Sequence, residues 1–202
     1  EKLLQFFHEK QIDRIQIGVI THPHKNHFGG FLDLLEKVRF DRFIINGDMN
    51  GEEGFGALMD QIKIRKIPFV TVKRGDFISN LPLEMTIAVL HPDKLDYSTN
   101  GNSMVLWITY KTKKILLTAD IEPLQQDDIL IHFPEVLTAD LVQIPHHGGE
   151  LSRSFIEAFR PKAVFVSTGK NDYGLPLEKY LNPFLGKIYR TDLEGHVTIN
   201  LP

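Results

Sequence analysis

Three histidines within six residues, His22, His24 and His27, are the side chains of this sequence best suited to chemistry. They stand in the stretch THPHKNHFGG (residues 21–30), directly after an apolar run that reads as a buried strand. Neutral imidazole is the commonest metal ligand in proteins. Alternate residues of an extended segment project to one side, so we expect His22 and His24 to share a metal. His27 lies past a turn and is expected to point elsewhere, towards a second metal. The alternative is a surface loop that happens to be rich in histidine.

Two further groups of metal-capable residues follow apolar strands later in the chain. His146 and His147 come after the run 141–144, and Asp120 comes after the run 115–119. The carboxyl ends of parallel strands meet at one edge of a sheet, where α/β proteins usually bind ligands. A carboxylate between two imidazole groups can give one oxygen to each of two metal ions. The alternative for Asp120 is to cap a helix that begins near Glu122, and the two roles are compatible.

Composition restricts the kind of metal site. The chain has no cysteine, which excludes disulfides and thiolate sites. A metal would therefore be held by histidine, carboxylate and water, which favours zinc, manganese or iron over a structural zinc finger. The net charge of −3 gives no overall attraction to nucleic acid or membrane, so a polyanionic substrate would need a local patch or the metal itself.

Length and composition indicate one ordered domain over residues 1–202. The chain has 42% hydrophobic and 24% charged residues, as ordinary globular proteins do. No apolar run approaches the ~20 residues that a membrane span needs, and no signal peptide is visible. We expect a cytoplasmic protein, with a secreted or extracellular domain as the alternative. Because Glu1 falls inside a predicted helix, we also expect the natural chain to begin earlier.

The elements that position these residues form a mixed α/β pattern. Strands alternating with helices in the first third predict parallel pairing with helical cover. There we expect Gly29 and Gly30 to form a tight turn into the next helix. Beyond residue 73 we predict a hairpin and a helix opened by Ser154 and Glu157 as a capping box. The predicted strands are 14–20, 41–46, 67–72, 85–90, 103–110, 114–118, 141–144 and 163–167, with a closing hairpin of 187–190 and 197–201. The predicted helices are 1–10, 31–38, 55–65, 122–132, 154–159 and 176–181.

Five stretches in order resemble one known family. They are THPHKNHFGG, NGNSMVLWITYKTKKILLTADI, LVQIPHHGGELS, VSTGKNDYGLP and YRTDLEGHVTI, and together they extend over nearly the whole chain. The first is similar to the His-x-His-x-Asp-His signature of the metallo-β-lactamase superfamily. The set resembles the soluble hydrolase domain of ComEC-type competence proteins and their stand-alone relatives. The resemblance implies a four-layer αββα sandwich with the metal site at one edge of the two sheets, here without the family's first N-terminal strands.

The resemblance also implies roles for individual residues. His22 and His24 would bind a first zinc or manganese ion and His27 a second. Asp120 would bridge the ions, and either His146 or His147 would complete a coordination sphere. Asp120 and His147 would take part in catalysis, with a metal-bound water as nucleophile in a mono- or dinuclear site. Contacts to substrate would come from two groups, Asn100, Asn102 and Ser103, and Lys170, Asn171 and Tyr173.

Four positions depart from the family pattern. Asn26 stands where the family has an aspartate that binds the second metal, and Leu175 stands where relatives commonly have a histidine. Ala119 replaces a glycine and Gly149 a serine, which are milder changes. An engineered change of aspartate to asparagine would also produce Asn26.

Two hypotheses follow. The first is a metal-dependent phosphodiesterase or nuclease, with DNA among its candidate substrates. The second is a catalytically degenerate module of the same fold that binds a protein or DNA. The retained histidines and Asp120 favour the first, while Asn26 and Leu175 favour the second. The sequence does not indicate an oligomeric state.

Overall fold

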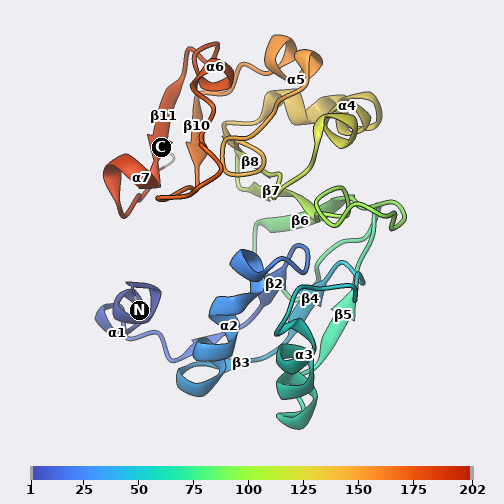
Figure 1. Cartoon of the computed structure of the whole chain (residues 1–202), viewed down its shortest axis with the longest axis vertical. Coiled ribbons are helices and arrows are strands. Elements are labelled where there is room, and N and C mark those ends of the chain that lie inside the picture. Colours follow the sequence, from blue (N-terminus) through green and yellow to red (C-terminus); the bar gives the residue numbers. More distant parts are fainter. Residues whose placement is uncertain (1, 201–202) are drawn as a thin grey trace. The chain divides into compact units, whose positions relative to one another are not determined.

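Short strands rich in isoleucine, valine and phenylalanine alternate with helices in the first third of the chain. The computed structural model describes residues 2–200, which divide into two units (Figure 1). The first unit comprises the residues up to Val72 together with Lys94–Asn102, and the second comprises Lys73–Asp93 and the residues from Ser103 onwards. The prediction of a single domain over 1–202 stays a prediction.

The first unit is built on parallel strands, as predicted. Its elements are α1 (Lys2–Glu9), β1 (Arg14–Ile15), β2 (Gly18–Ile20), α2 (Lys25–Lys37), β3 (Arg39–Phe40), β4 (Phe43–Ile45), α3 (Phe55–Ile64) and β5 (Phe69–Thr71). β2, β4 and β5 form one parallel sheet in that order, and β1 pairs with β3. Helices α2 and α3 pack together, and their apolar faces bury Phe28, Leu58 and Ile62 against Phe43 of the sheet. This core holds the end of β2, and hence the histidine stretch after it, in place.

The second unit contains a six-stranded sheet. Its elements are β6 (Met85–His91), β7 (Val105–Tyr110), β8 (Lys113–Leu117), α4 (Pro123–His132), the 3₁₀-helix η1 (Pro134–Thr138), β9 (Leu141–Gln143), α5 (Arg153–Ala158), β10 (Ala163–Val166), α6 (Glu178–Leu181), β11 (Lys187–Arg190) and α7 (Thr191–Glu194). The order is β6-β7-β8-β9-β10-β11. β6 to β8 are antiparallel and include the predicted hairpin, whereas β8 to β11 are parallel. The core includes Leu116, Val142, Phe155 and Val164.

Three local predictions are wrong. Gly29 and Gly30 lie inside α2, which starts six residues earlier than expected, because burial of Phe28 outweighs the roughly 1 kcal/mol that a helical glycine costs. The cap of α5 is Ser152, whose Oγ accepts a hydrogen bond from Phe155 N at 3.0 Å, so no box opens at Ser154. The closing hairpin is absent from the described residues, since β11 pairs in parallel with β10 and continues into α7.

Residue 201, at the end of that predicted hairpin, lies outside the described residues. The mixed α/β class is confirmed. Within residues 2–200, none of the helices combines the length and apolar character needed to cross a bilayer.

Candidate metal centre

The histidine stretch of the first unit gathers three imidazoles where β2 leads into the first turn of α2. His22 is fully buried, and its Nε2 lies 3.1 Å from Nδ1 of His24. The two rings meet nearly edge to face, with centroids 4.8 Å apart. This agrees with the expectation that alternate residues of the extended segment project to one side.

His27 lies against the same pair. Its ring centroid is 4.1 Å from that of His22, and the two residues have ring nitrogens within 4.8 Å of each other. The expectation that His27 points elsewhere is therefore wrong. The reason is that α2 begins at Lys25, which places His27 in the first helical turn, where its backbone N donates to His24 O at 2.9 Å.

Thr21 is a further member of this cluster that we did not single out from the sequence. Its Oγ1 lies 3.2 Å from Nδ1 of His22 and 3.4 Å from Nδ1 of His27. A hydroxyl both donates and accepts, so one threonine can fix the orientation of both rings. The sequence signal was its place at the end of an apolar strand, immediately before the first histidine.

The donor set of this cluster fits a divalent cation of the zinc class. Two ring nitrogens 3.1 Å apart, as in His22 and His24, repel each other through their lone pairs unless a proton or a cation lies between them. Neutral imidazoles in a thiolate-free site suit zinc, manganese or iron. Asn26, the second residue of α2, is exposed and leaves the first turn of that helix without an acidic residue.

A buried polar network supports the loops of the first unit. Asn102 donates from Nδ2 to Asp48 Oδ2 at 2.8 Å and to Asp96 O at 3.1 Å, and its Oδ1 accepts from Asp96 N at 2.8 Å. Asn46 Nδ2 donates to Asn102 O at 2.8 Å. The Asn102 side chain, predicted to contact substrate, thus ties together two loops. Asp48, only 4% exposed, was not picked out from the sequence.

In the second unit, Asp120 and His147 face each other. Asp120 is 2% exposed, and its Oδ2 lies 3.3 Å from Nε2 of His147. Nδ1 of the same ring lies 2.6 Å from the carbonyl oxygen of Ser167, so Nδ1 carries a proton and donates it there. Nε2 then faces the carboxylate with its lone pair, unless it binds a second proton or a cation. The hydrogen bond that the protonated ring makes to Asp120 raises the pKa of His147, and burial opposes that shift.

The backbone around this pair is strained. Ala119, His146 and His147 have φ values of 48°, 50° and 56°, in the left-handed region. Each such residue other than glycine costs roughly 1–2 kcal/mol. His146 N donates to Ala119 O at 3.0 Å, which joins the two strained segments. Strain of this kind persists only where surrounding structure holds it, and it is concentrated at functional sites.

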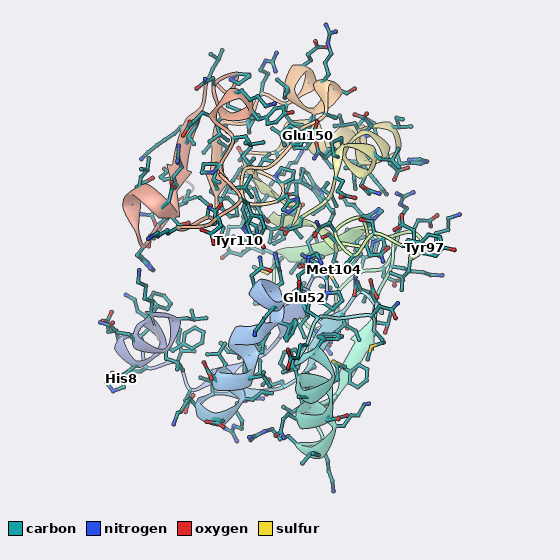
Figure 2. All side chains as sticks on the ribbon, viewed as in Figure 1. His8, Glu52, Tyr97, Met104, Tyr110 and Glu150 are labelled. Atoms are coloured by element: carbon teal, nitrogen blue, oxygen red, sulfur yellow. The ribbon has the colours of Figure 1, made fainter. Side chains whose placement is uncertain are left out.

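Ser103 and Gln126 form hydrogen bonds with the backbone around this pair. Ser103 Oγ accepts from Asp120 N at 3.2 Å. Gln126 is fully buried and donates to the carbonyl oxygens of Ile121 and Glu150 (the latter labelled in Figure 2), while its Oε1 accepts from Ser152 N. The N-cap of α4 is Glu122, so Asp120 does not cap that helix and the alternative role fails. A glutamine on a predicted helix gave no sequence signal of this function.

The remaining predicted contacts occupy loops. Asn171 donates to Gly169 O and Leu175 O and accepts from Tyr173 N, so its side chain closes its own loop. Tyr173 is 85% exposed and Lys170 is exposed. In the first unit, Asn100 Oδ1 is buried without a hydrogen-bond partner among the described residues. The substrate roles of these residues stay predictions.

Comparisons with known proteins identify relatives named ComE operon protein 3 and competence protein ComA. No protein-family model matches the chain. Over 202 residues, 96% of this chain and 26% of the relative, it is 28% identical to ComE operon protein 3 of Bacillus subtilis strain 168. Competence protein ComA of Neisseria gonorrhoeae is 27% identical over 115 residues, 54% of this chain and 17% of that protein. The chain thus spans about a quarter of the first relative and less of the second.

Solved structures support the fold. The diiron β-hydroxylase CmlA of Streptomyces venezuelae aligns with a TM-score of 0.54 at 16% identity, over 90% of this chain and 44% of CmlA. Its E377D mutant gives a TM-score of 0.56, over 88% and 43%. A Thermotoga maritima protein described as a Zn-dependent hydrolase of the metallo-β-lactamase superfamily aligns less closely, with a TM-score of 0.39 at 12% identity over 75% of this chain and 81% of that protein.

Proposed function

Because this chain is a ComEC-type protein with the metallo-β-lactamase fold, we propose that it is a metal-dependent hydrolase of phosphodiesters. The observation that carries the proposal is the cluster of His22, His24 and His27, whose ring nitrogens face one another at the end of β2. DNA is the first substrate to test, since one relative is named competence protein ComA.

From the family resemblance, we assign metal-ligand roles to residues of both histidine clusters and to Asp120. His22, His24 and His27 would offer neutral nitrogens, and Asp120 would offer the anionic oxygens. Among the later pair, we assign the ligand role to His147, because its Nδ1–H is committed to Ser167 O and its Nε2 is directed to Asp120. A histidine that ligates a metal characteristically donates its other ring N–H in this way.

The residues of this chain would do four things in the reaction. Thr21 orients the rings of His22 and His27, and Ser103 fixes the backbone that carries Asp120. Asp120 would offer its carboxylate to a cation from a buried position. A divalent cation, when bound, supplies Lewis-acid stabilisation of the charge on the attacked phosphoryl group. Lys170, beside the loop closed by Asn171, would offer positive charge to a substrate phosphate.

The second candidate is an inert binding module, and Asn26 is the observation that favours it. A neutral amide is a weaker ligand than the carboxylate of the family motif, so a second ion would lack one anionic contact. Such a module would bind metal weakly and would not hydrolyse phosphodiesters.

The test combines metal content with turnover. Protein purified without added metal should contain one to two equivalents of zinc or manganese by plasma mass spectrometry. His22→Ala with His24→Ala should remove that metal. Asp120→Ala should abolish hydrolysis of an aryl phosphodiester while the circular dichroism spectrum is unchanged. Bound metal with no turnover favours the module, and no bound metal even with excess zinc and manganese rejects the hydrolase.

A further inference from the structure

Glu52 fastens the beginning of α2 from a distant loop. It lies between β4 and α3 and is labelled in Figure 2. Its Oε2 accepts a hydrogen bond from Lys25 N at 2.7 Å, and its own backbone N donates to Pro23 O at 3.1 Å. These two bonds are reciprocal, as in a capping box. A capping box joins residues within one helical turn, whereas these bonds join segments 27 residues apart. Pro23 stands between His22 and His24, so Glu52 holds the segment that presents both rings.

Helix α2 lacks a cap of its own. His24 is its N-cap residue and makes no side-chain capping bond, and the first turn contains no acidic residue. A helix N-terminus leaves N–H groups unsatisfied and has the effect of about half a positive charge. A cation on the neighbouring imidazoles would add positive charge at the same turn, where His27 lies. Glu52 places a carboxylate there.

The loop that carries Glu52 is itself anchored. Asp48 fixes its first part through the bonds from Asn102 Nδ2 and Asn50 N. Its last part enters α3, where Phe55 N donates to Glu52 O at 3.0 Å and the Phe55 side chain is 2% exposed. The Glu52 carboxylate is therefore presented from a loop held at both ends.

We propose that Glu52 is a positioning residue of the metal centre, which fixes the His22–His24 segment and supplies the negative charge that position 26 lacks. The inference rests on the proposed function, since it assumes that these histidines bind a cation. It adds a residue from outside the histidine motif to the centre. The carboxylate acts through Lys25 N and the helix terminus and does not itself need to contact the metal.

The experiment compares Glu52→Ala, Glu52→Gln and the matched control Glu53→Gln, which changes the exposed neighbouring carboxylate. The zinc dissociation constant is measured by competition with a chromophoric chelator, and the Co²⁺-loaded proteins are compared by visible absorption. Glu52→Ala should weaken zinc binding by about tenfold, as the loss of a residue that orients metal ligands typically does. Glu52→Gln retains an acceptor without the charge and should lie between Glu52→Ala and the unchanged protein. The control should stay within about twofold, below the range that such losses produce.

The outcomes separate the two ideas. A merely structural Glu52 would lower the melting temperature of the metal-free protein and leave both the dissociation constant and the Co²⁺ spectrum of Glu52→Ala unchanged. That result would overturn the inference while the proposed function stands. If the unchanged protein binds neither zinc nor Co²⁺, the proposed function and the inference both fail.

Discussion

Gly148 should be far less tolerant of a side chain than another glycine of the second unit with nearly the same φ. Its φ is 88°, and a Cβ added there would lie 2.3 Å from Cβ of Pro176 and 3.1 Å from Cγ1 of Val166. Gly75 has a φ of 90°, but a Cβ there would meet no atom within 4 Å. The pair Gly148→Ala and Gly75→Ala therefore separates steric overlap from backbone strain.

The expected magnitudes follow from these two terms. The left-handed backbone costs an alanine roughly 1–2 kcal/mol at either position. Overlap with Pro176 adds about 1–3 kcal/mol at Gly148 alone, as overpacking of a filled interior does. Alanine also lowers the conformational entropy of the unfolded chain, by the same amount in both variants, so this contribution cancels when the two are compared. Gly148→Ala should thus lose about 1–3 kcal/mol more unfolding free energy than Gly75→Ala, which is the overlap contribution alone.

Thermal unfolding followed by circular dichroism provides the measurement. For a chain of this length, about 2–4 °C of melting temperature corresponds to 1 kcal/mol. Gly148→Ala should therefore melt about 2–12 °C below Gly75→Ala, on the extra 1–3 kcal/mol of overlap. Equal melting temperatures for the two variants would refute the reasoning, because they would mean that the loop carrying His147 can move away from Pro176 at no cost.

Two further predictions concern charge. Asn26→Asp should raise metal stoichiometry towards two and increase turnover of an aryl phosphodiester, because it restores an anionic ligand in the first turn of α2; equal stoichiometry and rate in both proteins would count against it. Asp140→Asn should reduce the loss of unfolding free energy that occurs when the pH is lowered from 7 to 3. The hydrogen bond from Lys162 Nζ, 2.6 Å long, lowers the pKa of Asp140, so its stabilisation is present above the ordinary pKa of about 3.9 and is lost as pH falls through the lowered value. Urea midpoints at pH 7, 5, 4 and 3 would test this against exposed Asp93→Asn, and parallel profiles would contradict it.

The sequence predicted the elements better than their ends. Apolar runs identified the strands that precede His22, Asp120 and His146, because burial leaves a strong compositional signal. The start of α2 was missed because glycines at positions 29 and 30 suggested a turn. The helix is favoured by burial of Phe28 in the tertiary structure, which the local sequence does not indicate. The cap at Ser152 was missed by two residues for a related reason, since the nearby Ser154 fits the same pattern locally.

The candidate site was predictable as far as its histidines and Asp120. Spacing along a strand relates His22 to His24, but the position of His27 depends on where the helix begins. Glu52 and Gln126 form hydrogen bonds with backbone atoms of other segments, and Thr21 contacts the ring nitrogens of His22 and His27 through its hydroxyl. Such bonds leave no periodic pattern in the sequence. The left-handed backbone at His146 and His147 was also hidden, since neither residue type demands it.

The mixed sheet of the second unit has a consequence for the order of folding. Strands β6, β7 and β8 pair with neighbours close in sequence, whereas β9, β10 and β11 pair in parallel after long crossovers. Pairings between distant segments form slowly, because loop closure costs entropy before the contacts form. The segment with His146 and His147 lies between β9 and α5, so we expect it to acquire its backbone conformation only when β9, β10 and β11 pair. Pulsed hydrogen exchange during refolding should therefore protect amides of β7 before those of β10.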